Sequence, residues 1–371
     1  MTSLKHTADH IVVGGGIIGL LTAYYLIEDG ARVLLVERGE IGREASWAGG
    51  GILSPLYPWR YPEAVTHLVQ WSQTQYPALT EQLHESTGID PQWTHSGLLI
   101  LDKEEPEVAR YWAEHTQTPL HSISDIDLYE IEPALSRAYK DALWLPNVAQ
   151  ARNPRLVKAL QQYLAQRGVT FMNQTEVINV LTKGQKVRGL STNKGDIAGD
   201  SVVIACGAWS AALTAQLGLS LDVHPVRGQM IMIKTEPGRV QRIVLNDGRY
   251  IIPRRDGSVL VGSTLEHVDF DKSTTTTARE ALKQVAGQLI PALQDYEITL
   301  HWAGLRPGSS DNIPTIDTHP AIEGLYINAG HYRNGVVMAP ASARLMADLL
   351  LGQDSAFNTS LFKAKRPSSA S

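Results

Sequence analysis

Three glycines near the start of the chain have the spacing of a nucleotide-binding turn. Gly14, Gly16 and Gly19 form a GxGxxG pattern between an apolar run and a helical pattern. In such a turn the first glycine permits the tight bend, the second lets the backbone approach a pyrophosphate, and the third lets helix and strand pack closely. Glu37 follows Gly19 by 18 residues, where its carboxylate can accept hydrogen bonds from ribose hydroxyls. Because an acid there disfavours a 2′-phosphate, the pattern predicts FAD or NAD in preference to NADP.

Three further segments rich in glycine and small residues favour FAD over NAD. They are residues 45–53 (ASWAGGGIL), 202–210 (VVIACGAWS) and 329–335 (AGHYRNG). Consecutive glycines in the first segment allow backbone N–H groups to line a large cofactor. The other two each end an apolar strand before a helix, and the last offers a second helix N-terminus to developing negative charge. An NAD-dependent reductase would normally need a second dinucleotide-binding unit, and the sequence contains no second GxGxxG.

The glycine pattern lies in a stretch that predicts a strand, a turn, a helix and a second strand. Residues 11–13 are apolar without alternation, which is typical of a central strand in a parallel sheet. Ala23 and Leu26 have helical spacing, and Gly30 ends the helix. We expect the second strand at residues 33–36, parallel to the first.

A second, strand-rich unit is predicted between residues 223 and 261. An Asp-Gly pair joins residues 250–253 to 258–261 as a hairpin. Residues 61–145 have mixed patterns interrupted by prolines, so we expect an inserted region there. The remaining elements expected in the first layer are a helix at 154–166, a strand near Val169, turns at 183–184 and 194–195, strands at 202–205 and 325–329, and a helix at about 337–351.

The composition fits a globular protein of two or three domains and excludes several classes. The 371 residues are 43% hydrophobic, and the net charge of -5 offers no basic surface for nucleic acid. The single cysteine, Cys206, excludes an intrachain disulfide framework and favours a reducing cytoplasm. The apolar stretch at 11–27 is interrupted by four glycines, so we expect no transmembrane helix and no membrane association. Only Lys5 is basic ahead of it and no cleavage site follows, so we expect the mature chain to start near Met1.

Seven segments give the chain a family resemblance. In order between residues 10 and 352 they are GGGIIG, VER, ASWAGGGIL, VVIACGAWS, YIIPRRDG, HWAGLRPG and GHYRNGVVMAP. With these segments the chain resembles the FAD-dependent amine and amino-acid oxidases of the D-amino-acid oxidase group, and among them the bacterial glycine oxidases of thiamine biosynthesis. The combination of WAGLRPG and GHYRNG is the most specific part of the resemblance.

The resemblance implies an α/β fold with a Rossmann-like FAD-binding domain and a second, sheet-rich (α+β) substrate-binding domain. It also implies a homo-oligomer, a tetramer by analogy with the family. The bounds that we expect are 1–80, 146–220 and 306–360 for the discontinuous FAD-binding domain, 81–145 and 221–305 for the substrate-binding domain, and 361–371 for a flexible tail.

Three residues match family positions in contact with substrate. Arg306, in WAGLRPG, matches the arginine that pairs with the substrate carboxylate, and a planar guanidinium can do so through two parallel hydrogen bonds. Tyr250, which opens YIIPRRDG, matches a tyrosine whose hydroxyl reaches the same carboxylate. Arg333, in GHYRNG, matches a residue close to the substrate amine and the flavin, where its backbone carbonyl would act.

The cofactor implied by the resemblance is non-covalent FAD. Relatives among the sarcosine oxidases attach FAD through a cysteine near the arginine motif, and residues 296–312 contain none. The twelve histidines lack HxH or HExxH spacing, so we expect no metal site. Besides the three glycines of the first turn, the positions that align with FAD contacts are Ile17, Ile18, Glu37, Arg38, Ala45, Ser46, Gly50, Gly51, Ile52, Val177, His331, Tyr332, Arg333, Asn334, Gly335, Val336 and Val337.

The reaction implied is oxidative deamination of glycine and other small amines such as sarcosine. The implied positions of Ile52 and Leu265 line the pocket, where their bulk would favour a small substrate. No acid, histidine or cysteine stands out as a general base, which suits hydride transfer from the substrate carbon to flavin with orientation supplying most of the rate. The imine product would hydrolyse to an oxo acid and ammonia, and dioxygen would be reduced to hydrogen peroxide. The alternatives are a D-amino-acid dehydrogenase with a quinone or carrier acceptor, and a non-catalytic FAD-binding protein.

Overall fold

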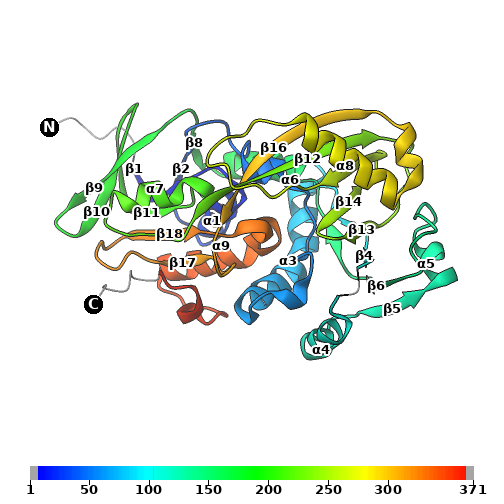
Figure 1. The fold of residues 1–371 in the computed structure, drawn as a ribbon. Coiled ribbons are helices and arrows are strands. Elements are labelled where there is room, and N and C mark those ends of the chain that lie inside the picture. Colours follow the sequence, from blue (N-terminus) through cyan, green and yellow to red (C-terminus); the bar gives the residue numbers. More distant parts are fainter. Residues whose placement is uncertain (1–6, 103, 365–371) are drawn as a thin grey trace, which may run out of the picture.

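The computed structural model describes residues 7–102 and 104–364 (Figure 1). Within these residues the strands form two eight-stranded sheets and one two-stranded sheet. The predicted start of the mature chain near Met1 and residues 365–371 of the predicted tail lie outside them. The predicted tail begins too early, because Phe362 is buried in the first hydrophobic core.

The first sheet is built around the strand that precedes the glycine turn, β1 (Thr7–Val13). Its path runs β17-β18-β11-β1-β2-β8, and β9 and β10 extend it beside β11. β1 pairs in parallel with β2 and β11, so the predicted parallel arrangement is confirmed. The other strands of this sheet are β2 (Val33–Val36), β8 (Thr170–Met172), β9 (Val177–Lys183), β10 (Lys186–Thr192), β11 (Gly195–Ile204), β17 (Thr315–Thr318) and β18 (Leu325–Ala329).

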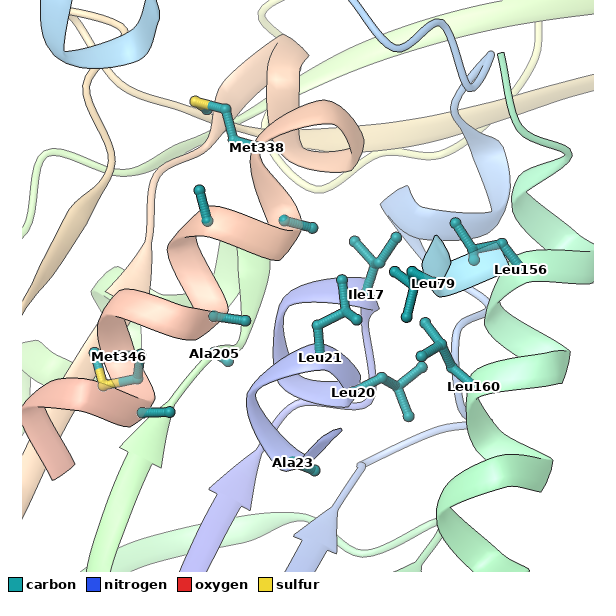
Figure 2. Packing of buried hydrophobic residues seen from close by; sticks show 14 of the residues in the cluster. Ile17, Leu20, Leu21, Ala23, Leu79, Leu156, Leu160, Ala205, Met338 and Met346 are labelled. Atoms are coloured by element: carbon teal, nitrogen blue, oxygen red, sulfur yellow. The ribbon is translucent and has the colours of Figure 1, made fainter. Parts of the chain in front are cut away.

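Both faces of this sheet are covered, which explains why its central strands are apolar without alternation. Val12, Leu35 and Val203 belong to the core that the helices form, whereas Ile11 and Val202 pack with the apolar side chains of β9 and β10. Figure 2 shows α1 between α9 and α6 in the helical core. The helices of this core are α1 (Ile17–Glu28), α3 (Glu63–Thr87), α6 (Asn153–Gln166) and α9 (Gly335–Leu351).

The second sheet lies at the other end of the molecule in Figure 1. Its order is β16-β12-β15-β14-β13-β4-β6-β5, and α8 covers the face that carries Ile231 and Val261. The other face carries Met230 and Tyr250 and meets the first sheet's loops. Its elements are β4 (Leu98–Ile100), β5 (His121–Ser124), β6 (Asp141–Leu145), β12 (His224–Lys234), β13 (Ile243–Asn246), β14 (Arg249–Pro253), β15 (Ser258–Gly262), β16 (Ile298–Gly308) and α8 (Thr276–Leu289).

Short elements connect these layers. The small sheet pairs β3 with β7. The predicted hairpin is present as β14 and β15. The connecting elements are β3 (Thr94–His95), β7 (Ala149–Gln150), α2 (Ala45–Ala48), α4 (Pro106–Thr116), α5 (Asp125–Ile131), α7 (Ser210–Ala215), and the 3₁₀ turns η1 (Pro58–Arg60), η2 (Gly207–Trp209), η3 (Pro291–Asp295), η4 (Tyr332–Asn334) and η5 (Thr359–Phe362).

Residues 61–145 do not form one inserted region, so that prediction is wrong. Leu68 and Leu83 of α3 belong to the same core as α1, because one face of this helix is apolar along its whole length. The domain boundary predicted after residue 80 therefore falls inside α3. The boundary predicted between residues 305 and 306 falls inside β16. No helix among the described residues is long and apolar enough to cross a membrane.

His319, directly after β17, makes the stability of the fold sensitive to acid. The residue is only 7% exposed, and its Nδ1 atom accepts hydrogen bonds from the backbone N–H groups of Ala321 at 3.2 Å and Ile322 at 3.1 Å. Burial lowers the pKa of His319 below its ordinary value of 6.5. The unfolded chain therefore takes up a proton more readily, and the stability that this histidine contributes is lost as pH falls below about 6.5.

We expect His319→Asn to reduce this acid sensitivity, because an amide oxygen can accept the same hydrogen bonds without titrating. Between pH 7.5 and 5.5 the free energy of unfolding of the wild type should fall by about 1 kcal/mol more than that of the variant. Urea denaturation of the FAD-loaded protein at both pH values measures the difference. His67→Asn, at an exposed site on α3, is the control. Equal losses in wild type and His319→Asn would show that His319 does not cause the effect.

Candidate active site

A long cleft runs from the glycine turn after β1 to the second sheet, and residues of both sheets line it. It brings together segments that are far apart in the sequence, including the turn before α1 and the residues before α9. Most of the predicted site residues line this cleft. They are Gly14, Gly16, Ile17, Ile18, Glu37, Arg38, Ala45, Ser46, Gly50, Val177, Tyr250, Arg306, His331, Tyr332, Arg333, Gly335 and Val336.

The glycine turn joins three elements where no side chain fits. Gly14 has a φ of +113°, and a Cβ atom there would overlap the backbone carbonyl of Ala205 at the end of β11. A Cβ atom on Gly19 would overlap the carbonyl oxygen of Gly14, so this glycine allows α1 to pack on the turn. Gly19 therefore contributes through packing and does not line the cleft. The N–H groups of Gly14, Gly15 and Ile17 donate within the protein, whereas Gly16 and Ile18 line the cleft at the N-terminus of α1, where the helix favours an anion.

Glu37 and Ser46 fix the shape of the turn. Each carboxylate oxygen of Glu37 accepts one backbone N–H, from Gly15 and from Gly39, both at 2.8 Å. A carboxylate oxygen has a second lone pair, so Glu37 can still accept a hydrogen bond from a ligand in the cleft. Ser46 Oγ accepts the N–H of Ile17 at 2.8 Å, which connects the start of α1 to α2.

A buried arginine positions the triple-glycine loop. Arg254 donates from Nη2 to the carbonyl oxygen of Gly50 at 2.7 Å, and from Nη1 to Gln150 at 2.5 Å. Ala151 donates its N–H to the carbonyl oxygen of Gly51 at 2.9 Å. Burial lowers the pKa of Arg254 to about 9. The loop thus takes its position from the second sheet's hairpin, and Gly51 faces Ala151 while Gly50 faces the cleft.

The WAGLRPG segment presents three alternate residues of β16 to the cleft side. Trp302 donates from Nε1 to the carbonyl oxygen of Ala48 at 2.9 Å. Gly304 allows Ala48 to approach, because a Cβ atom at 304 would overlap it. Arg306 extends across Gly228 of β12, where a Cβ atom would overlap the guanidinium. Since alternate residues of a strand share a face, this one segment contacts α2 and also supplies the arginine.

Tyr250 lies on the same side of the second sheet. Gly262 is its cross-strand neighbour on β15, and Met230 of β12 lies beyond Gly262. The tyrosine ring passes over Gly262, and its hydroxyl is 3.8 Å from the sulfur of Met230. This hydroxyl also interacts with the Arg306 guanidinium. The predicted pair of Arg306 and Tyr250 is therefore brought together at one wall of the cleft.

Arg306 is a half-buried cation at the wall of the cleft that forms no ion pair within the part of the chain described. It donates from Nη2 to Ser263 Oγ at 2.6 Å and from Nη1 to the carbonyl oxygen of Thr264 at 3.3 Å. Its desolvation lowers its pKa, and the positive charge of Arg333 acts in the same direction. A buried charge is stabilised by an opposite charge, so a carboxylate that enters the cleft would find a strong partner here.

The start of α9 closes the other wall of the cleft. His331, Tyr332, Arg333 and Gly335 line it, and the last of these begins the helix. Burial lowers the pKa of His331 to about 3, so its ring stays neutral at physiological pH. Its Nε2 atom and the Oδ1 atom of Asn328 are buried, and neither has a hydrogen-bond partner among the described residues. Two such polar atoms beside a helix N-terminus indicate a site for a polar ligand.

Five predicted positions of the cofactor set do not line the cleft, and one predicted pocket residue is also elsewhere. Leu265 is 45% exposed because Thr264 and Glu266 on either side of it point inward. The five cofactor positions pack against neighbouring helices, strands and turns and so do not reach the cleft. They are Gly19 and Gly51, which face backbone carbonyls, Ile52, which packs beside Tyr250, and Asn334 and Val337, which are buried at the start of α9.

Sequence reasoning missed several cleft residues. Trp209 of η2 stacks under the guanidinium of Arg38 at 3.7 Å and closes the end of the cleft that Val177 also lines. Gly228, Met230 and Gly304 were missed because only the pairing of β12 with β16 brings them to the site. Other unpredicted residues of the cleft include Ala48, Thr175, Glu176, Cys206, Gly207, Leu305 and Asn328.

Cys206 is packed, as predicted, although it also lines the cleft. Its thiol donates to the carbonyl oxygen of Val13 at 3.4 Å. Burial raises the pKa of Cys206 to about 12, so it is neither a thiolate nucleophile nor a base at neutral pH. No group of three histidine, cysteine, aspartate or glutamate side chains with metal-binding geometry occurs in residues 7–102 and 104–364.

Comparison with known proteins matches residues 9–349 to the FAD dependent oxidoreductase family. The chain belongs to this family. Its sequence is 50% identical over 345 residues to the glycine oxidase of Pseudomonas aeruginosa, covering 93% of this chain and 95% of that protein. Its structure is similar to that of glycine oxidase from Geobacillus kaustophilus, with a TM-score of 0.93, 32% identity and coverage of 98% and 100% of the two chains. A bifunctional ThiO/ThiG protein of Trichormus variabilis is 31% identical, and the chain covers 53% of it.

The cleft of this FAD-dependent oxidoreductase fits the cofactor of its family. The glycine turn places Gly16 and the N-terminus of α1 at the cleft, where a pyrophosphate can lie, and Glu37 keeps free lone pairs for ribose hydroxyls. The unpaired atoms of Asn328 and His331 provide hydrogen-bonding capacity where α9 begins. The α/β fold, the FAD cofactor and the membership in this oxidoreductase family are therefore confirmed.

Proposed function

We propose that the protein is a glycine oxidase that deaminates glycine and other small amines, such as sarcosine and small D-amino acids. The observation that carries the proposal is Arg306, a half-buried cation beside the Tyr250 hydroxyl at the wall of the cleft, without an anionic partner among the described residues. The high identity to proteins named glycine oxidase supports the choice of substrate. The ThiO/ThiG relatives support a further role, supply of the glycine imine for thiazole formation in thiamine biosynthesis.

In the proposed reaction the chain's own residues bind and orient the substrate. The Arg306 guanidinium pairs with the carboxylate, and the Tyr250 hydroxyl donates a second hydrogen bond to it. The Arg333 backbone carbonyl accepts from the amine. Non-covalent FAD, when bound along the cleft, supplies the two-electron oxidation and passes both electrons to dioxygen.

The proposed balance consumes one glycine, one dioxygen and one water and yields glyoxylate, ammonia and hydrogen peroxide. A hydride, which carries both electrons, leaves the substrate carbon of the neutral amine, and water adds to the resulting imine to release ammonia. His331, which also lines the cleft, has a pKa of about 3 and binds a proton only weakly, which supports a mechanism without a side-chain base. Holding the substrate carbon against the flavin would then supply most of the rate enhancement, and Arg306 and Tyr250 would contribute mainly by binding the carboxylate.

The same proposal includes how the protein is organised. We propose that the first sheet and its helices, with the whole of α3, form the FAD-binding domain and that the second sheet, with the whole of β16, forms the substrate-binding domain. We also propose that the protein forms a homotetramer. We propose a cytoplasmic location, because the single cysteine excludes an intrachain disulfide.

The proposal is tested on the purified protein with its flavin. We expect a flavin absorbance spectrum that bleaches with glycine under anaerobic conditions and returns in air with one hydrogen peroxide per glycine consumed. Bleaching by glycine without peroxide in air would favour the D-amino-acid dehydrogenase alternative with another acceptor. A flavin that no small amine reduces would overturn the enzyme assignment and favour an FAD-binding protein without catalysis.

A further inference from the structure

A single carboxylate organises the surroundings of Arg306 without touching it. Glu266 Oε2 accepts hydrogen bonds from Arg227, from Nε at 3.1 Å and from Nη2 at 2.5 Å. Its Oε1 accepts from Gln229 Nε2 at 2.9 Å and from the hydroxyl of Thr264. The side chain of Arg227 is 6% exposed and that of Glu266 is 25% exposed. Four donors therefore converge on this one partly buried carboxylate.

Thr264 connects Glu266 to the guanidinium of Arg306. Arg306 extends over Gly228, so the side chains of the adjacent Arg227 and Gln229 project to the opposite face of β12, where they meet Glu266. Thr264 supplies the carbonyl oxygen that accepts from Arg306 Nη1 at 3.3 Å, and the neighbouring Ser263 hydroxyl accepts from Nη2 at 2.6 Å. Glu266 thus holds, from the opposite face of the sheet, the segment that contacts Arg306.

The backbone strengthens this connection. Arg227 and Glu266 exchange both backbone hydrogen bonds, at 2.9 and 3.0 Å, and Thr264 donates its N–H to the carbonyl oxygen of Gln229 at 3.2 Å. The N–H of Gln229 in turn donates to the Thr264 hydroxyl at 2.9 Å. The segment after β15 therefore stays paired with β12 beyond Gly262, where the strand itself ends.

Glu266 remains ionised at neutral pH. Burial by itself raises its pKa, but the hydrogen bonds from Thr264, Arg227 and Gln229 outweigh burial and lower the pKa overall. A charged acceptor forms stronger hydrogen bonds than a neutral one, so the connection depends on this ionised carboxylate.

We infer that Glu266 is a positioning residue for the substrate carboxylate, which acts by fixing Thr264 and the β12 segment around the Arg306 guanidinium. The inference rests on the proposed function, because it assumes that Arg306 binds the substrate carboxylate. In this role Glu266 contacts neither substrate nor cofactor. Its removal should loosen the orientation of Arg306 and weaken carboxylate binding, while FAD binding and the oxidation of bound substrate stay nearly intact.

The first test uses Glu266→Gln in the FAD-loaded protein. An amide cannot accept hydrogen bonds on both sides, so either the Arg227 or the Gln229 and Thr264 contacts are lost. We expect the KM for glycine and the Kd for acetate, measured from the change in flavin absorbance, both to rise about tenfold, as loss of one charge-assisted hydrogen bond would give. The rate of anaerobic flavin reduction at saturating glycine and the Kd for FAD should change less than about twofold.

Asp271→Asn is the matched control. Asp271 also pairs with Arg227, at 2.5 Å from Nη1, but its side chain is 52% exposed and its other hydrogen bonds go to Ser273, away from Thr264 and Gln229. We expect its KM for glycine and its Kd for acetate to stay at the wild-type values. Equal increases in both variants would show general loosening around Arg227 and would overturn the inference, as would unchanged values in Glu266→Gln.

A second variant serves if Glu266→Gln does not fold. Thr264→Val keeps the shape of the side chain and removes the hydroxyl that donates to Glu266. The carbonyl oxygen of the same residue, which accepts from Arg306, then loses its connection to Glu266. It should raise the same two constants, and an unchanged Kd for acetate would overturn the inference. If glycine does not reduce the wild-type flavin, the proposed function fails, yet the acetate titration still decides the role of Glu266. A wild-type protein that binds no acetate would remove the carboxylate site and the inference with it.

Discussion

Replacing Arg306 by alanine should lower kcat/KM for glycine by about a thousandfold, mostly through a higher KM. This factor corresponds to the loss of two charge-assisted hydrogen bonds to the substrate carboxylate, each worth about 2 kcal/mol. Two N–H groups of the guanidinium already donate to Ser263 and Thr264. The hydrogen bonds lost with substrate are therefore those of the N–H groups that face the cleft. Oxygen consumption over a range of glycine concentrations measures kcat and KM, and the flavin spectrum shows that the variant keeps its FAD.

Arg255→Ala is the control for this prediction. Arg255 follows β14, pairs with Asp90 at 2.9 Å and does not line the cleft. Removing it takes away an arginine that follows a strand of the same sheet, without changing the proposed carboxylate site. We expect its kcat/KM to equal that of the wild type. An Arg306→Ala enzyme with a normal KM for glycine would remove Arg306 from the substrate site.

The second large effect is expected from Gly14→Ala, which should raise the Kd for FAD about a hundredfold. A non-glycine residue at a φ of +113° costs about 1–2 kcal/mol, and overpacking against the Ala205 carbonyl adds about 1–3 kcal/mol. The turn can relieve the overlap only by moving away from β11, which displaces the N–H groups proposed to bind the pyrophosphate. Titration of the apoprotein with FAD, followed by flavin fluorescence, gives the Kd.

Gly30→Ala separates backbone strain from overlap. Gly30 has a φ of +85°, and no atom lies within 4 Å of the position that a Cβ atom would take. This variant therefore has similar strain at the end of α1 and no collision. Its Kd for FAD should stay within about twofold of the wild-type value. Equal weakening in both variants would mean that strain, and not the contact of the turn with β11, controls FAD binding.

Local patterns predicted the parts of the site that depend on neighbours in sequence. The turn from Gly14 to Gly19 and Glu37 lie within one strand-helix-strand unit, whose spacing is set by the unit itself. The strands at 33–36 and 325–329 were also predicted with their observed bounds, because both are short apolar runs with clear turn residues at their ends.

Residues whose position depends on strand pairing were not predicted. Gly228 looks like any strand glycine until β12 pairs with β16 and places it beneath Arg306. Glu266 has no local signal, since its partners come from β12 and from its own segment. The pocket role expected for Leu265 was wrong because alternation along an extended segment turns it outward between Thr264 and Glu266. Family resemblance alone pointed to Arg306, Tyr250 and Arg333.

The position of β1 in its sheet has a consequence for how the protein is made. This apolar strand lies early in the chain, yet His10 lies beside Ser201, 191 residues away in sequence. During synthesis one edge of β1 stays unpaired until β11 emerges, and such long-range pairing is slow and exposes apolar strands to aggregation. The cleft is complete only after α9 is added, so FAD cannot gain its full set of contacts on a nascent chain. Cofactor supply should therefore affect the yield of folded protein late, after nearly all of the chain has left the ribosome.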